Sequence, residues 1–165
     1  MVELYGEKHT EQIIRVILGE ALDHILSAID CLEKIAESFS GEYLAINYLA
    51  VYGDFYEAGV HVSKAYFKVG GPDSVNMAEI FEPALAAINT GMLYFQGCFC
   101  EWKAARPDGK TCPPGLTPHA VMAIGLEIEK GKGLMRQAYD IVHDKILGLV
   151  DALREMDAIR IITAD

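Results

Sequence analysis

Three stretches of the sequence each carry a histidine with carboxylates close by, a combination that can bind a metal ion. They contain Glu20, Asp23 and His24; Asp54, Glu57 and His61; and Asp140, His143 and Asp144. Residues three or four apart on a helix share a face, so each histidine and one carboxylate could offer two ligands to the same ion. The pairs with this spacing are Glu20/His24, Glu57/His61 and Asp140/His143. Mixed imidazole and carboxylate ligation suits iron, zinc or manganese.

These residues predict a metal site only if three helices bring their histidines to the same height. The candidate ligands are His24, His61, His143, Glu20, Asp54, Glu57 and Asp140. A di-iron bundle needs two Glu-x-x-His pairs and a carboxylate from each of the other two helices. Only Asp140 and His143 have that spacing, and no carboxylate lies between Pro83 and Cys100. A mononuclear three-histidine site, with oxidoreductase or hydrolase activity, therefore stays open as an alternative to ordinary half-buried histidines.

The charged residues of the second stretch also have a simpler interpretation. Asp54, Glu57, His61, Lys64 and Lys68 follow one another at helical spacing. Mixed-charge stripes of this kind are usually solvated helix faces.

A second set of potential ligands is Cys98, Cys100, Cys112 and His119. These residue types suit zinc or an iron–sulfur cluster. However, Cys98 and Cys100 are two residues apart and point away from each other on a helix. Buried thiols are the favoured interpretation, because free cysteine is ordinarily a small buried hydrophobe. No phosphate-binding loop, dinucleotide fingerprint or Gly-x-Ser-x-Gly motif accompanies either set.

The elements that must position these residues are helices, because apolar residues recur in alternating steps of three and four. We expect a first helix from about Thr10 to Ser40–Gly41, a second through Val69, a third from Pro83 to Ala105 and a fourth from Pro118 towards Ile159. Ser74 could cap a short separate turn through Phe81, and Gly131 and Gly133 are expected to bend or split the fourth helix. Long helices with short loops predict an all-α, up-down four-helix bundle, a single domain over residues 1–165.

Three apolar seams, each a line of residues at this spacing, define the expected core. The first contains Ile14, Leu18, Ala21, Ile25, Ala28, Leu32, Ile35 and Phe39. The second contains Leu44, Tyr48, Val51, Phe55, Ala58, Val62, Ala65 and Val69. The last contains Met135, Tyr139, Val142, Ile146, Leu149, Leu153 and Met156. In the third helix, Ala84, Ala87, Gly91 and Cys98 form a side of small residues that a neighbouring helix can approach closely.

Charge and composition narrow the class of partner. The 165 residues include 24 acidic and 14 basic side chains, giving a formal net charge of −10. This balance argues against a nucleic-acid partner and against an anionic membrane surface. The longest uncharged stretch, Ala84–Cys100, is 17 residues long, and a spanning helix needs about 20. Four cysteines without a signal-like apolar stretch at the start indicate reduced thiols and a cytoplasmic location.

The second helix is apolar on more of its circumference than a monomeric bundle can cover. Ile46, Val60 and Phe67 lie nearly opposite its seam. We therefore expect self-association, or binding of a partner protein, through the second and third helices, as a homo-oligomer or complex. Two alternatives stay open: the metal-binding bundle, and a carrier of a small ligand lined by the aromatic residues of the second helix.

Overall fold

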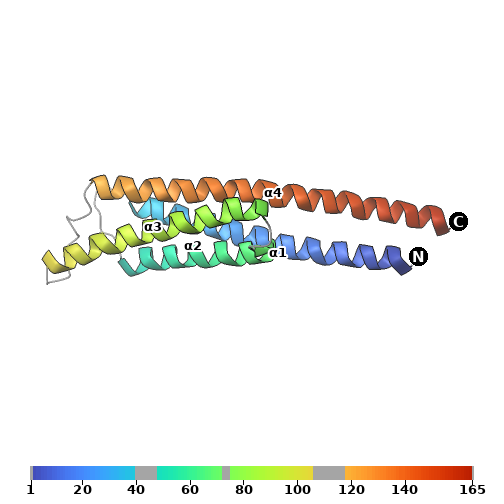
Figure 1. Cartoon of the computed structure of the whole chain (residues 1–165), viewed down its shortest axis with the longest axis horizontal. Helices are drawn as coiled ribbons and strands as arrows, with labels where there is room; N and C mark the ends of the chain where they lie inside the picture. Colours follow the sequence, from blue (N-terminus) through green and yellow to red (C-terminus); the bar gives the residue numbers. More distant parts are fainter. Residues whose placement is uncertain (1, 40–47, 72–74, 106–117, 165) are drawn as a thin grey trace.

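The computed structural model describes the backbone of residues 2–39, 48–71, 75–105 and 118–164, and the side chains of residues 10–39, 48–71, 76–97 and 119–155. Within these ranges the chain forms four helices and no strand: α1 (Val2–Ser38), α2 (Tyr48–Lys68), α3 (Val75–Ala105) and α4 (Pro118–Ala164). Each helix packs against the next along the chain, and α4 closes the ring against α1 (Figure 1). The predicted all-α up-down four-helix bundle is confirmed.

The predicted seams form the core. Ala21, Ile25, Ala28, Leu32 and Ile35 of α1 are fully or almost fully buried, as are Val51, Phe55, Ala58, Val62 and Ala65 of α2. On α4, Met135, Val142 and Leu153 are buried, and Tyr139, Ile146 and Leu149 pack against the core. The expected stop after α2 is also present, because Gly70 and Gly71 take φ values of 115° and 56°, which favour glycine.

Two predicted helix starts were wrong, because each helix is longer than expected. α1 begins at Val2 rather than near Thr10. At the other end of the chain, α4 continues to Ala164, so residues 159–162 extend this helix. The segment 75–81 is the start of α3, so Pro83 lies inside that helix and not at its first position. Proline removes one backbone hydrogen bond from a helix interior, and burial of Met77, Ile80 and Phe81 in the core holds this first part of α3 in place. Ser40–Gly41, Leu44, Ser74 and the 106–117 connection lie outside the described residues.

The predicted break in α4 at Gly131 and Gly133 is absent, because the helix is continuous through both residues. Gly131 is buried where α4 meets two other helices. A Cβ atom at Gly131 would lie 3.4 Å from Leu32 of α1 and 3.6 Å from Ile88 of α3. The glycine therefore serves close helix packing rather than helix termination.

A second close approach joins α2 to α3. A Cβ atom at Gly91 would lie 3.1 Å from Cε1 of Phe55 and 3.5 Å from Cβ of Glu127. Phe55 is itself almost completely buried. The small side of α3 thus receives the most deeply buried ring of α2, as the spacing of small residues predicted.

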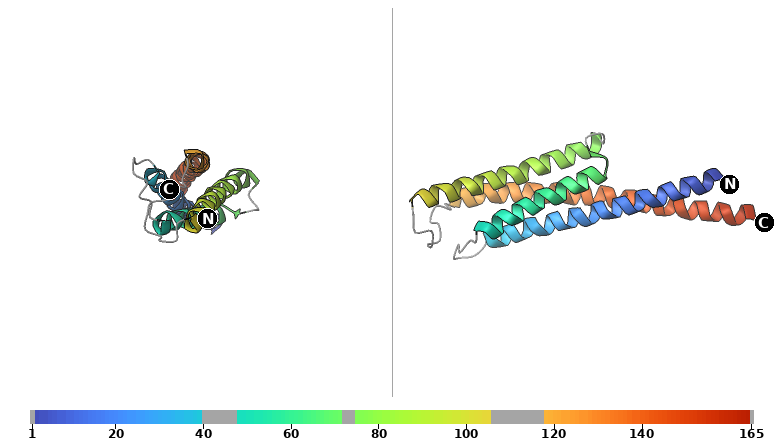
Figure 2. Two further views of the ribbon diagram at one scale, coloured as in Figure 1. Left: turned by 90° about the vertical axis from the view of Figure 1, so that its left-hand side faces the viewer. Right: turned by 90° about the horizontal axis from the view of Figure 1, so that it is seen from below.

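α1 and α4 extend well past the hairpin of α2 and α3, so only these two helices continue towards the chain ends (Figures 1 and 2). Lys68, the last residue of α2, contacts Glu20 of α1. Earlier residues of α1 therefore lie beyond the end of α2. In the described part of the chain, no helix is both long and apolar enough to cross a membrane.

Gly133 and Gly91 have different surroundings, and substituting alanine at each of them tests this packing. Gly133→Ala should raise the free energy of unfolding by about 1 kcal/mol, because alanine is the better helix former and nothing lies within 4 Å of the new Cβ. Gly91→Ala should lower it by about 1 kcal/mol, because overpacking against a buried ring outweighs the helix propensity. Urea unfolding followed by circular dichroism measures both. A gain in both variants would contradict the close approach of Phe55.

Candidate functional site

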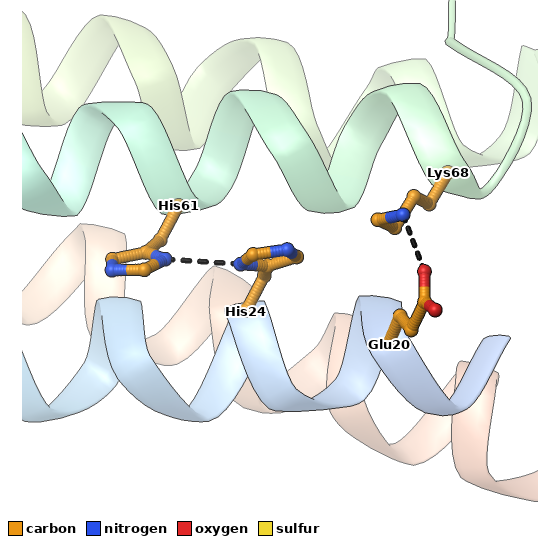
Figure 3. Close-up of polar contacts among 4 residues, drawn as sticks. All are labelled: Glu20, His24, His61 and Lys68. Carbon is orange, nitrogen blue, oxygen red and sulfur yellow. Dashed lines mark hydrogen bonds and ion pairs between the residues drawn. The ribbon is translucent and has the colours of Figure 1, made fainter. Parts of the chain in front are cut away.

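The fold brings together two of the three predicted histidines at the boundary between α1 and α2. Nδ1 of His24 lies 3.0 Å from Nδ1 of His61, and the ring centroids are 5.3 Å apart (Figure 3). Both side chains are half-buried. One ring must donate its Nδ1 proton while the other accepts at Nδ1. This hydrogen bond is lost when both rings are protonated, because two N–H groups would then face each other.

Positive charges surround this pair. Lys68 forms an ion pair with Glu20, next to His24 along α1 (Figure 3). Burial is the main cause that lowers the pKa of His24, and the positive charges of His61, Lys64 and Lys68 lower it further. The Lys68 contact lowers the pKa of Glu20. Burial and these charges therefore favour the neutral state of His24, in which a nitrogen lone pair can accept a proton or bind a metal ion.

The other predicted carboxylates of α2 lie further along the same boundary. Oε2 of Glu57 is 3.9 Å from the Sγ atom of Cys31, which is buried. Burial, then the charges of Glu57 and Asp54, raise the pKa of the Cys31 thiol. The pKa of Asp54 is also raised, mainly by burial. The mixed-charge stripe of α2 is thus a helix–helix boundary rather than a fully solvated face.

The third histidine does not join the pair. His143 is exposed on α4, against the expectation that it is half-buried, and its ring stacks on Tyr139 at a centroid distance of 5.8 Å. α4 contacts the flank of α1 where Glu33 approaches Arg136 within 4.0 Å. His24 faces α2, so α1 separates the two histidines.

The seven predicted ligands accordingly divide among separate places: the His24–His61 pair, Glu20 on Lys68, Glu57 and Asp54 near Cys31, and the exposed Asp140 and His143 of α4. Among the described side chains, no group of three or more His, Cys, Asp or Glu residues lies close enough to hold a metal ion. Cys98, Cys100 and Cys112 fall outside those side chains, and His119 is exposed at the start of α4.

A second candidate site is an open, mainly apolar groove of about 540 Å³ between α2 and α3. It is lined by Phe55, Tyr56, Gly59, Val60, Ser63 and Lys64 of α2, and by Leu85, Ala86, Ile88, Asn89 and Met92 of α3. The predicted aromatic residues of α2 separate into two groups. Phe55 and Tyr66 belong to the core, whereas Tyr56 and Phe67 point outward.

The outward residues of α2 follow a second regular seam, which includes Val60 and Phe67, predicted to lie nearly opposite the core seam. We call it the outer seam of α2, and it consists of Leu49, Gly53, Tyr56, Val60, Ser63 and Phe67, in steps of four and three. Leu49, Tyr56 and Phe67 are 77%, 62% and 82% exposed. Such spacing is the pattern by which one helix packs along another.

Comparisons with protein-family models, with curated proteins and with solved structures gave no match for this chain. A proposal for the function of this chain therefore rests on the chemistry of its described side chains.

The electrostatics of the histidine pair predict a pH dependence of stability. The pKa of His24 is lowered on folding, so the unfolded chain binds this proton more readily, and the contribution to stability is present above the unfolded pKa of about 6.5. It is lost as the pH falls through the lower folded pKa. His24→Asn removes the titrating group and should flatten the stability profile between about pH 7 and 5.

Urea unfolding across this range compares the native chain with the variant. His143→Asn is the matched control, because it removes an exposed histidine of α4. An equal loss of stability on acidification in the native chain and His24→Asn would contradict the assignment.

Proposed function

We propose that this protein is a helical interaction module that binds an amphipathic helix along the outer face of α2 and α3. The observation that carries the proposal is the outer seam of α2: its three largest apolar side chains are more than half exposed, and one of them, Tyr56, lines the apolar groove. Burying a large apolar side chain is worth about 1.5–3 kcal/mol. A helix laid in a hydrophobic groove gains this energy at anchor positions of matching spacing.

The scarcity of charge on this face supports a protein interface. From Pro83 to Cys100, α3 carries no charged residue, although the chain as a whole has a net charge of −10. Leu93 of α3 is exposed and extends the apolar surface of α3. Depletion of charged residues is characteristic of interface cores.

The shape of the groove favours a helix over a small ligand. Pockets for small molecules enclose most of the surface of the ligand, whereas this groove is open to solvent. The outer seam runs from Leu49 to Phe67, 18 residues apart, which corresponds to about 27 Å of helix. The occupant is therefore a helix of several turns, from a second copy or from a partner protein. The buried, free Cys31 agrees with a cytoplasmic location for this module.

Site-specific photocrosslinking tests this proposal. A photoreactive phenylalanine analogue placed at Phe67 should give crosslinked adducts in cells, because the ring is exposed within the proposed interface. The same analogue at Leu126, an exposed apolar residue of α4, is the matched control. The mass and composition of each adduct distinguish a second copy from another protein.

Tyr56→Glu should remove the Phe67 adducts, since a carboxylate would then replace an apolar anchor of the outer seam and lose its hydration in the complex. Purified partner and native chain should bind in vitro and lose affinity at least tenfold with this variant, equivalent to about 1.4 kcal/mol. Equal adducts at Phe67 and Leu126, or adducts that persist in Tyr56→Glu, would contradict the proposal.

A second candidate function is the binding of a divalent transition metal by His24 and His61. The 3.0 Å separation of their Nδ1 atoms favours it, because two imidazoles from different helices already lie side by side. Lys64 and Lys68 oppose it, since their charges act on the same ring. We therefore rank it below the interaction module.

Elemental analysis of the chain, purified without chelators from medium that contains iron, zinc and manganese, tests this candidate. Stoichiometric metal that is lost in both His24→Ala and His61→Ala, and kept in His143→Ala, would establish the pair as the binding site. Metal at only trace level, together with no heat of zinc binding in titration calorimetry, would exclude it.

A further inference from the structure

Two exposed side chains of opposite charge flank the outer seam of α2 on the side of α1. Glu57 directly follows Tyr56 of the seam, and Lys64 directly follows Ser63. Seven residues, or about two helical turns, separate the two charges, so they lie on the same flank of the helix. Both side chains are exposed. A helix that packs along the outer seam therefore meets an acidic group nearer the start of α2 and a basic group nearer its end.

The sizes of the side chains also change along the outer seam, on either side of Val60. Phe67 follows Val60 by seven residues, and Gly53 precedes it by seven. Tyr56 precedes Val60 by four residues, and Ser63 follows it by three. A Cβ atom at Gly53 would have nothing within 4 Å, so the surface above this glycine can receive a side chain. Each large ring thus has a small residue at nearly the same distance on the other side of Val60.

We infer that the outer face of α2 and α3 is covered by the same face of a second copy, with the two α2 helices antiparallel and Val60 near the twofold axis. The inference rests on the proposed function, because it names the occupant of that face. In this pairing, Phe67 lies opposite Gly53 of the second copy, and Tyr56 lies opposite Ser63 of the second copy. Large side chains therefore meet small ones along the contact, which is the complementarity that close packing requires.

The charges become complementary in the same arrangement. A twofold axis across antiparallel helices brings the same flank of both copies side by side. The Glu57 carboxylate then lies close to the level of Lys64 of the second copy, and the symmetry repeats this contact, so each dimer forms two equivalent ion pairs. Such pairs beside an apolar seam select the orientation and register of packed helices. Although each copy has a net charge of −10, no charged residue of α3 between Pro83 and Cys100 opposes the contact.

The size of this face agrees with a stable dimer. The outer seam spans about 27 Å and two adjacent helices are about 20 Å wide, so α2 and α3 offer on the order of 500 Å² in projection. Aromatic side chains measure about 150–250 Å² each, and Tyr56 and Phe67 are 62% and 82% exposed. These two rings alone therefore supply on the order of 300 Å². Because interlocking side chains have a larger accessible area than their projection, the contact approaches the roughly 800 Å² per partner of a standard interface.

Exchange of the two charges tests the antiparallel pairing. In sedimentation equilibrium at about 0.15 M salt, the native full-length chain should be a dimer. Glu57→Lys or Lys64→Glu should weaken the dimer at least tenfold, because each variant brings like charges together twice. The combined variant Glu57→Lys/Lys64→Glu should restore the native affinity, since opposite charges then meet again. Asp144→Lys and Lys145→Glu are the matched controls: they make the same charge changes at exposed positions of α4, which lies across the bundle from α2.

A larger side chain at Gly53 tests the register. Gly53→Leu should weaken the dimer at least tenfold, because leucine fills the space that Phe67 of the second copy needs. Gly133→Leu of α4 is the matched control, since a Cβ atom at either glycine has nothing within 4 Å, and this control should stay dimeric. Far-UV circular dichroism should show both variants folded, because leucine is a better helix former than glycine.

The outcomes separate this inference from the proposed function. A monomeric native chain whose Phe67 adducts in cells contain another protein would overturn the inference and leave the proposed function standing. A dimer that Gly53→Leu strengthens, or that the combined charge variant does not restore, would overturn the antiparallel pairing centred on Val60. A dimer that none of these variants weakens would also overturn it, because self-association would then use another surface. A monomeric chain without specific Phe67 adducts would refute both.

Discussion

The axial register of the helices is set where large side chains pack against glycine. Phe55 of α2 fits against Gly91 of α3, and Leu32 and Ile88 fit against Gly131 of α4. A seam of alternating three and four residue steps by itself tolerates a slip of seven residues, because the apolar pattern repeats. Here such a slip would bring Phe55 against Ala84 or Cys98, and both carry a Cβ atom where the ring needs space. The two glycines therefore select one register among several that would bury similar apolar area.

This register determines what lies at the boundary of α1 and α2. Only with α2 in this position do His24 and His61 meet, with Glu20 beside Lys68 and Cys31 beside Glu57. These polar contacts are largely at the rim of the boundary, where an ion pair contributes little to stability. Their contribution is to the character of the site: two adjoining imidazoles beside positive lysines, and a thiol whose pKa is raised first by burial and then by its acidic neighbours.

Much of the fold could be predicted from the sequence because the spacing of apolar residues within each helix predicts which of its faces is buried. The central residues of the seams through Leu32, Phe55 and Val142 are buried as expected, whereas Ile14 is exposed. The stop at Gly70–Gly71 lies where the glycines and Pro72 predicted it. The predictions that were wrong concern features that depend on packing against neighbouring helices. Pro83 and Gly131 are local signals for a helix end, but tertiary packing overrides them. The same limit applies to the histidines, since the spacing within one helix does not tell which flank of α1 meets α2 and which meets α4.

The unequal lengths of the helices separate two surfaces that a compact bundle would not have. α2 ends at Lys68, and α3 starts close to the same level, whereas α1 and α4 continue. Where four helices run side by side, the outer face of α2 and α3 is unusually apolar. Ile13 and Ile17 of α1 lie beyond the end of α2, so a partner bound on the outer seam of α2 does not cover them.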